Sequence, residues 1–225
     1  MKKVLFFTSQ FPTYSETFVV RQVESLIQQG FDVQILSLLP GDTNTSINPD
    51  VLAPLIDKTR YVLKEKQGTI AKLIYRALLL CVCLLNKQGR KILNFRKNSG
   101  NSFSLLAAIC GELIQGKQHY DADVIIAHFG NNAVLANKLR DLGFLKGKIF
   151  AIFHGFDISS TQFVNQYTHD SQHLFESNMM ALPVSELWAN KLKTLGCPSA
   201  KINVHRMGVD THTFMFNPIN TVLSP

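Results

Sequence analysis

Residues Val4–Leu39, VLFFTSQFPTYSETFVVRQVESLIQQGFDVQILSLL, decide the fold class of this chain. The stretch opens on a short apolar run, Val4–Phe7, and closes on a second β-rich run, Asp32–Leu39. Between them, apolar residues recur at helical spacing at Phe18, Val19, Val23, Leu26 and Ile27. A strand, a helix and a strand within about 35 residues predict parallel pairing with a right-handed crossover.

Local signals mark the boundaries of this unit. Thr13 and Glu16 have the spacing of a capping box, which predicts the start of the helix. Gly30 follows the last periodic residue and predicts its end. Residues Pro40–Pro54 are rich in turn formers, so we expect a loop after the second strand.

The rest of the chain continues with helices and strands. Two apolar helices are expected at Ile70–Leu85 and Asn101–Gln115. Further strands are expected at Val124–Ala127, Ile149–Phe153, Met180–Val184 and Ile202–Met207, and further helices at Ala133–Leu142, Asp170–Asn178 and Glu186–Leu195. This alternation predicts an α/β fold, a Rossmann-like doubly wound parallel sheet, with a helical insertion in the middle.

Positive charge is concentrated in one segment. The chain has 225 residues, 46% of them hydrophobic, which suits one large domain with or without an insertion. Lys58–Lys97 holds eleven of the 23 lysines and arginines but one acid, Glu65. Such a segment predicts an anionic partner, a membrane surface or nucleic acid. Because the segment is more aliphatic than aromatic and carries no nucleic-acid motif, we expect the membrane and no nucleic acid.

The apolar runs are too short to cross a membrane. The longest, Ala77–Leu85, has nine residues, whereas a spanning helix needs about 20. The helix Ile70–Leu85 would be about 24 Å long and could lie in the membrane interface. We therefore expect a cytoplasmic protein held peripherally at the inner face of the cell membrane. The four cysteines lack the paired spacing of a zinc site and fit free thiols in a reducing compartment.

Polar residues gather where the predicted strands end. The strand ends supply Thr8–Gln10, His128–Gly130, His154–Asp157, Ser185–Glu186 and Gly208–Asp210. Ligands of parallel sheets bind outside the carboxyl ends of the strands, so these residues predict one cleft. Ser185 is explained by a helix N-cap alone. The two histidine motifs, each with an aromatic beside a glycine, are better candidates for function.

Several other sites are disfavoured. No Gly-x-Gly-x-x-Gly follows the first strand and no acid ends the second, which argues against a dinucleotide site. His169 and His173 could share a metal on one helix face, but a solvated helix surface explains them better. No nucleophile elbow of the Gly-x-Ser-x-Gly type is present. We expect neither a metal nor a cofactor.

Six motifs, in order along nearly the whole chain, resemble a bacterial group of family 4 glycosyltransferases that makes colanic acid and similar exopolysaccharides. They are PTYSETF at Pro12–Phe18, GFDV at Gly30–Val33, AHFG at Ala127–Gly130, FHGFDI at Phe153–Ile158, VS at Val184–Ser185 and GVDTHTF at Gly208–Phe214. Each motif is weak alone, whereas the ordered set is specific.

The resemblance implies the GT-B fold, in which two Rossmann-like domains face a cleft. Residues 1–215 would form the N-terminal, acceptor-side domain, with the basic helical insertion at about 58–115, and residues 216–225 would begin the interdomain linker. The C-terminal donor domain is expected to be absent from this chain, so the chain alone is expected to be inactive. A complete enzyme would transfer a hexose, with retention and usually without a metal, from a UDP- or GDP-sugar to a glycan or lipid-linked acceptor. The nucleotide-sugar is then a substrate, bound mainly by the donor domain.

The resemblance also implies residue roles. His154 would stand beside the donor sugar as the catalytic residue. The other substrate-binding residues would be Ser15, Glu16, Thr17, His128, Phe129, Gly130, Gly155 and Asp157. A structural role competes in each case: capping explains Glu16, and a core histidine could explain His154. A stand-alone flavodoxin-like binding or regulatory domain remains the alternative, although it has no need of the Gly208–Asp210 ending.

Overall fold

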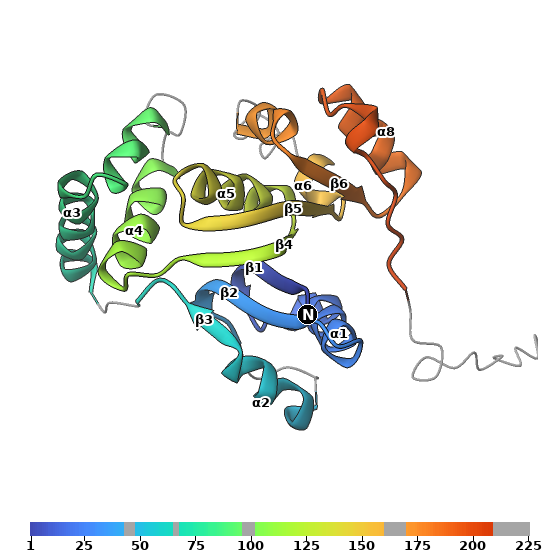
Figure 1. Cartoon of the computed structure of the whole chain (residues 1–225), viewed down its shortest axis with the longest axis horizontal. Coiled ribbons are helices and arrows are strands. Elements are labelled where there is room, and N and C mark those ends of the chain that lie inside the picture. Colours follow the sequence, from blue (N-terminus) through green and yellow to red (C-terminus); the bar gives the residue numbers. More distant parts are fainter. Residues whose placement is uncertain (43–47, 65–67, 96–101, 160–169, 209–225) are drawn as a thin grey trace, which may run out of the picture.

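Six parallel strands form the centre of the molecule in a computed structural model that describes residues 1–42, 48–64, 68–95, 102–159 and 170–208 (Figure 1). The strands are β1 Lys3–Phe11, β2 Asp32–Pro40, β3 Thr59–Tyr61, β4 Tyr120–His128, β5 Leu145–Phe153 and β6 Met179–Pro183. They lie in the order β3-β2-β1-β4-β5-β6, and every neighbouring pair is parallel. The predicted doubly wound, Rossmann-like sheet is confirmed.

Helices connect these strands. The longer helices are α1 Thr17–Gln28, α2 Pro49–Asp57, α3 Thr69–Leu85, α4 Ser102–Gln115, α5 Gly130–Asp141 and α8 Glu186–Thr194. Short ones are η1 Tyr14–Glu16, η2 Gly89–Phe95, α6 Phe156–Ser159 and η3 Ser199–Lys201, and residues 170–176 are also helical. The Ser185 hydroxyl accepts a hydrogen bond from the Trp188 N–H at 3.4 Å, so the predicted N-cap of α8 is confirmed.

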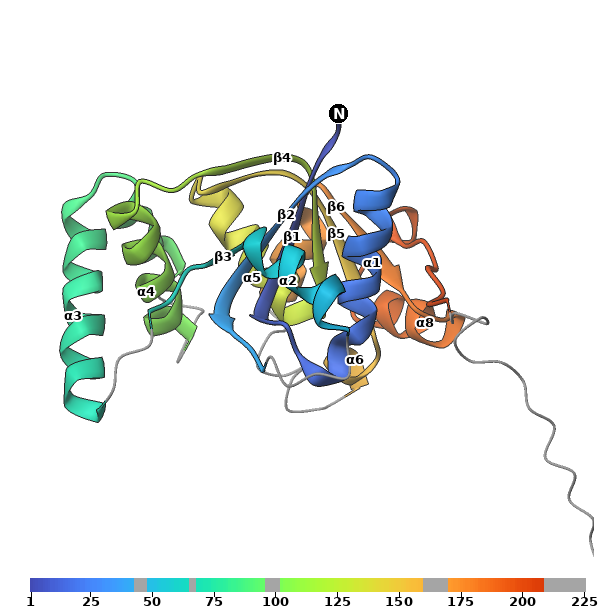
Figure 2. The same ribbon diagram turned by 90° about the horizontal axis from the view of Figure 1, so that it is seen from below.

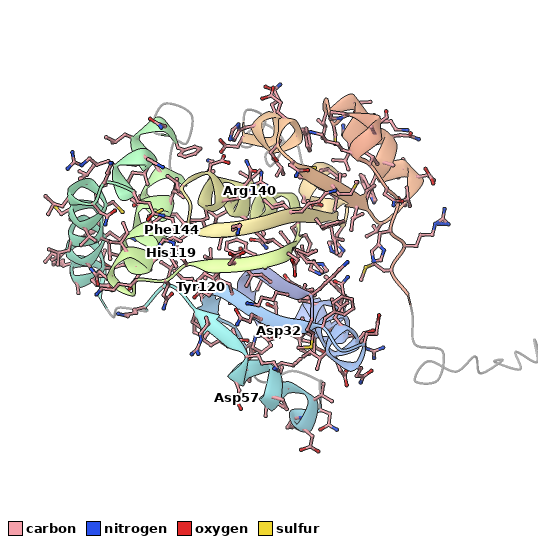
Figure 3. The ribbon with its side chains drawn as sticks, in the orientation of Figure 1. Asp32, Asp57, His119, Tyr120, Arg140 and Phe144 are labelled. Carbon is pink, nitrogen blue, oxygen red and sulfur yellow. The ribbon has the colours of Figure 1, made fainter. Side chains whose placement is uncertain are left out.

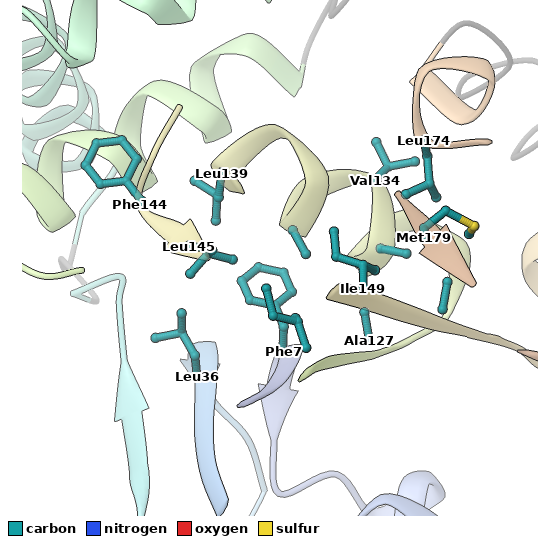
Figure 4. Packing of buried hydrophobic residues seen from close by; sticks show 14 of the residues in the cluster. Phe7, Leu36, Ala127, Val134, Leu139, Phe144, Leu145, Ile149, Leu174 and Met179 are labelled. Carbon is teal, nitrogen blue, oxygen red and sulfur yellow. The ribbon is translucent and has the colours of Figure 1, made fainter. Parts of the chain in front are cut away.

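Successive residues of β1 enter two different cores. Val4 and Phe6 belong to a cluster that α1 and α2 complete, whereas Leu5 and Phe7 belong to the larger cluster on the opposite face of the sheet. Figure 4 shows Phe7 packed among residues from β2, β4, α5 and β5. Both faces of the sheet are covered, which explains why the strands read as continuous apolar runs.

The predicted insertion at about 58–115 is too wide. Its first residues form β3, an edge strand paired with β2. Its second helix, α4, buries Leu106, Ile109 and Leu113 in the larger core. In the described part of this segment, α3 alone lies outside this core for most of its length, packed on α4 at the side of the molecule away from α8 (Figures 1 and 2).

Part of the expected loop Pro40–Pro54 is helical. The Asn48 side chain accepts from the Asp50 N–H, and Pro49 occupies the first turn of α2, where proline is tolerated. Leu52 and Leu55 are buried against the cluster around α1, so tertiary packing outweighs the cost of Pro54 inside the helix.

The expected capping box at Thr13 is wrong. The Thr13 hydroxyl donates to the Gln10 carbonyl at 3.3 Å, and neither the η1 nor the α1 N-cap makes a side-chain capping bond. A 3₁₀ turn occupies that position, and α1 begins at Thr17. Glu16 is therefore left without the capping role that would have explained it.

The expected strand Ile202–Met207 is reduced to one bridge, between Ala181 and Ile202. Two further backbone bonds, from Asn203 N–H to Ala181 O and from His205 N–H to Pro183 O, keep this segment beside β6.

Within the described residues, no single helix is long and apolar enough to cross a membrane. The consecutive helices α3 and η2 are together long and apolar enough, but the chain bends by 103° between them.

Candidate active site

The predicted cleft lies where the strand order reverses. β1 and β4 are neighbours at the centre of the sheet, and the chain leaves them toward opposite sides. This is the topological switch point at which parallel α/β sheets bind ligands. β1 continues to Phe11, so Thr8–Gln10 lie inside the strand and not after it. His128 is the last residue of β4, and His154 directly follows β5.

A cavity of about 240 Å³ opens at this edge of the sheet. Its lining consists of Thr8, Ser9, Gln10, Thr13, Glu16, Phe129, Asn131, Asn132, Phe156 and Asp157. The polar members are hydroxyls, amides and two carboxylates, groups that hydrogen-bond sugar hydroxyls well. No lysine or arginine is among these lining residues.

Two imidazoles are paired beside this cavity. His128 Nδ1 lies 3.0 Å from His154 Nε2, and His128 Nε2 lies 2.8 Å from the Gln22 side-chain oxygen. Because Gln22 Oε1 can only accept, Nε2 of His128 carries its proton, and Nδ1 accepts from the Nε2–H of His154. Nδ1 of His154 is then the unprotonated end of a three-residue chain and can accept one further hydrogen bond.

Burial keeps both imidazoles neutral. His128 is 1% exposed, and burial, reinforced by the nearby His154 and His205, lowers its pKa to about 3. Burial likewise lowers the pKa of His154 to about 4. Aromatic rings supply the apolar surroundings: the centroids of Phe18 and Phe129 lie 4.6 and 4.7 Å from that of His154.

Phe129 holds a backbone conformation that side chains rarely adopt. Its φ is +69° and its ψ 142°. Such strain costs of order 1–3 kcal/mol and tends to occur at functional sites. The conformation turns the chain from β4 into α5 and sets the Phe129 ring against both His154 and Phe18.

Asp157 joins the two histidine loops. One carboxylate oxygen accepts from the Gly130 N–H at 2.8 Å, and the other accepts from the N–H groups of His154 and Gly155 at 3.2 and 2.9 Å. Burial raises the pKa of Asp157, and these backbone bonds partly offset that rise. Although Asp157 lines the cavity, its bonds identify it first as the clamp between the loops.

The predicted glycines have packing reasons. A Cβ at Gly155 would lie 2.5 Å from the Trp188 ring, and its φ is +113°. A Cβ at Gly130 would lie 2.8 Å from the Phe153 ring. Residue 155 is therefore a glycine because the Trp188 indole packs closely against its backbone. The sequence suggested that a ligand would make this close approach.

The Ser15–Thr17 turn contributes one residue to the cavity. Glu16 lines it, and burial raises the pKa of its carboxyl group. Ser15 is exposed, and Thr17 is the first residue of α1; neither lines the cavity. Of the predicted residues, the structure thus brings together Glu16, Phe129 and Asp157 around the cavity, with the histidine pair beside it.

Two further residues of the site were not predicted. Gln22 ends the imidazole chain from α1, and Asn132 bridges the Ser9 hydroxyl to the His128 carbonyl, to which its amide donates at 2.9 Å. Gln22 lies in the second turn of α1, and Asn132 lies in the first turn of α5, in its GNN start. Nothing in the sequence marks either of them beyond the neighbouring strand ends.

No metal centre is present among the described residues, where no group of three or more His, Cys, Asp or Glu side chains could hold an ion. His173 lies 2.7 Å from Asp141, and His169, its possible metal partner, falls outside the described residues. Burial raises the pKa of Cys83 and Cys197 to about 11, so these thiols are packing groups. Gly208 is exposed, and Val209 and Asp210 fall outside the described residues.

The fold and site define an α/β domain with a polar cavity at the switch point of a doubly wound sheet. No protein-family model matches the chain. Its fold is shared with the crystal structure of Anabaena Alr3699/HepE in complex with UDP and glucose, at a TM-score of 0.52 and 11% identity over 97% of this chain and 47% of that one.

Proteins with similar sequences identify the class of enzyme to which the chain is related. The chain is 42% identical over 224 residues to the protein named as the colanic acid biosynthesis glycosyltransferase WcaL in Escherichia coli K12, covering 99% of this chain and 54% of that protein. It is 38% identical over 213 residues to the amylovoran biosynthesis glycosyltransferase AmsK of Erwinia amylovora, covering 94% and 52%. The chain is thus a homologue of exopolysaccharide biosynthesis glycosyltransferases and spans about half the length of these relatives.

Proposed function

We propose that this chain is the acceptor-side domain of a retaining GT-B glycosyltransferase of surface polysaccharide synthesis. The enzyme would transfer a hexose from a UDP- or GDP-sugar to a lipid-linked glycan. The observation that carries the proposal is the neutral His128–His154 pair beside the switch-point cavity, in a homologue of exopolysaccharide glycosyltransferases. A stand-alone binding domain is not favoured, because the relatives are named as transferases.

The chemistry assigns a part to each group. Positive charge develops at the anomeric carbon during transfer, and a neutral imidazole can accept a hydrogen bond from a nearby sugar hydroxyl without opposing that charge. His154 offers Nδ1 for such a bond, and Glu16 with the amides of Asn131 and Asn132 offers partners for acceptor hydroxyls. The leaving diphosphate needs cations, which the lining of this cavity does not supply. A second domain would supply them together with most of the donor site.

A transfer assay tests this division. The 225-residue chain and a two-domain enzyme that contains it are incubated separately with radiolabelled UDP- and GDP-hexoses and a polyprenyl diphosphate-linked glycan. Label should reach the lipid fraction in the two-domain reaction, and none above background should appear with the chain alone. Turnover by the chain alone would contradict the proposed division, and absence of turnover by both, with every donor, would contradict the transferase assignment.

The same proposal places the enzyme peripherally on the cytoplasmic face of an anionic membrane. Exposed apolar residues recur along α3 at helical spacing, namely Ile70, Leu73, Ile74, Leu78 and Leu85. Ile70 and Leu85, near the two ends, are 74% and 82% exposed. Leu79 and Cys83, on the opposite side, are buried. An outward apolar stripe on a basic helix is the pattern of a helix that lies in the membrane interface.

Vesicle sedimentation tests the membrane contact. The chain should sediment with vesicles containing anionic lipid at low salt, and high salt should weaken binding, because each nearby cation contributes roughly 1 kcal/mol at an acidic surface. Leu73→Ser with Leu78→Ser should release the chain. The matched control, Leu187→Ser on α8, removes an equally exposed leucine away from the stripe and should not. Binding that is absent or indifferent to salt contradicts this contact.

A further inference from the structure

A second cavity, of about 360 Å³, lies on the inner side of α3. Its walls are apolar, formed by Leu39, Leu63, Leu79, Leu105 and Ala108. Its polar residues are Lys64, Lys72, Tyr75, Arg76 and Glu112. The residues from α3, at positions 72, 75, 76 and 79, have one-face helical spacing, and that face is opposite the exposed stripe. The two sides of α3 are therefore different surfaces, one open and apolar and one enclosing a basic cavity.

Positive charge dominates this cavity. Its one carboxylate, on Glu112, is buried and already engaged: it accepts a hydrogen bond from the Tyr75 hydroxyl and lies 3.6 Å from the Lys64 ammonium. Lys72 and Arg76 make no ion pair in the part of the chain that the structure describes, and both are exposed at the mouth. A ligand with two or more negative charges and an apolar body matches this combination.

Shared lining residues place the basic cavity in one row with the candidate active site. It shares Leu105 with a small cavity of about 70 Å³, and that one shares Ser9, Asn131 and Asn132 with the cavity beside the histidine pair. Leu39 is the last residue but one of β2, and Leu63 comes two residues after β3, so the basic cavity lies on the carboxyl edge of the sheet, as the active site does. Figure 2 shows the first turns of α3 directed to this edge.

We propose that the basic cavity binds the diphosphate and first prenyl units of a lipid-linked acceptor, whose glycan then extends past Leu105 to the histidine pair. Lys64, Lys72 and Arg76 hold the diphosphate, and the leucine walls cover the adjoining prenyl chain. This site rests on the proposed function for the identity of the glycan it delivers. The binding of the prenyl diphosphate itself requires neither donor nor transfer.

Calorimetric titration of the full 225-residue chain with farnesyl diphosphate tests the site. Lys72→Gln with Arg76→Gln should weaken binding at least roughly tenfold, because charge-assisted bonds to phosphate are lost. The matched control, Lys87→Gln with Arg90→Gln, removes the same charges from exposed residues of the same basic segment outside the cavity, and should bind as the parent does. All three proteins should keep their thermal midpoint within a few degrees.

Two probes identify the source of the phosphate. Farnesol lacks the diphosphate and inorganic diphosphate lacks the prenyl chain, so each should bind at least roughly tenfold more weakly than farnesyl diphosphate. If inorganic diphosphate binds as tightly as farnesyl diphosphate, the site recognises any diphosphate anion and not the prenyl chain. If the control variant loses as much affinity as the cavity variant, the net charge of the segment and not the cavity explains binding. Either result overturns the proposal. If the chain does not bind farnesyl diphosphate but the two-domain enzyme still transfers sugar, this inference alone is refuted. If the chain binds farnesyl diphosphate but the two-domain enzyme transfers no sugar, the proposed function alone is refuted.

Discussion

The buried histidine pair predicts that the domain loses stability in mild acid. In the folded chain burial holds the pKa of His128 at about 3 and that of His154 at about 4, against an ordinary value of 6.5. The unfolded chain therefore binds protons below pH 6.5 that the folded chain does not bind. By linkage, the contribution of the pair is fully present above pH 6.5 and is lost progressively as the pH falls from 6.5 through 4 to about 3.

The size of the effect depends mainly on the unfolded state. At pH 5.0 an unfolded imidazole is almost fully protonated, and both folded pKa values lie below 5. Between pH 7.5 and 5.0 linkage then gives about 2 kcal/mol for His128, and somewhat less for His154, which is partly exposed to solvent. Glu16 and Asp157 have raised pKa values and act in the opposite direction, so variants in the same background are needed.

Urea denaturation followed by circular dichroism at pH 7.5, 6.5, 5.5 and 5.0 measures the loss. Parent protein should lose about 3 kcal/mol or more across this range, and His128→Gln with His154→Gln should remove most of the slope. His119→Gln is the control, because His119 is exposed and precedes β4 at the opposite end of that strand from His128, beside Phe144 (Figure 3). A parent stability that stays constant to pH 5.0, or a slope that survives the double substitution, would refute the neutral-pair argument.

Three substitutions test other parts of the molecule. His154→Ala in a two-domain enzyme should lower kcat about 10²-fold or more and change KM much less, as expected of a contact made mainly in the transition state; if the protein instead unfolds, His154 is structural. Gly155→Ala should destabilise the domain by about 1–3 kcal/mol in thermal or urea unfolding, because its Cβ overlaps Trp188. Asp170→Asn should cost about 3–5 kcal/mol in urea unfolding, because Asp170 compensates the buried Lys138 ammonium at 2.6 Å.

A second substitution serves as the control for the stability predictions at Asp170 and Gly155. Asp121→Asn removes a carboxylate from the exposed Lys146–Asp121 pair and should cost less than about 1 kcal/mol. A loss as small as this for Asp170→Asn would contradict the buried-pair argument. For Gly155→Ala, adding Trp188→Leu should recover part of the loss if the overlap with the indole is its cause.

The sheet was predictable because apolar runs and their spacing report burial directly. The alternation of strands and helices gave the doubly wound topology, and strand ends located the cleft. The errors arose where tertiary contacts decide local structure. α2 forms despite two prolines because Leu52 and Leu55 have a core to enter, and β3 is a strand of three residues defined only by its pairing with β2. No local pattern carries that information.

The sequence predicted the site residues at the strand ends, but not the residues and contacts that hold them in place. His128 and His154 are marked by their motifs, whereas Gln22 reaches His128 across 106 residues of sequence and follows no motif. Asp157 and Gly155 were identified as important, but their reasons, a backbone clamp and an indole neighbour, depend on loops that meet only after folding. The capping box at Thr13 failed because the chain forms a 3₁₀ turn before α1.

The proposed lipid-linked acceptor offers one explanation for two costly features of this domain. The edge of the sheet carries a strained Phe129 backbone and a fully buried imidazole, while α3 leaves an apolar stripe exposed to water. Neither feature stabilises an isolated soluble domain. The row of neighbouring cavities begins on the inner face of α3, behind the exposed stripe, and ends at the histidine edge. The proposed acceptor would account for both, because its lipid end would lie in a membrane and its sugar end would reach the imidazoles. A water-soluble acceptor would account for the edge and leave the exposed stripe of α3 without a cause.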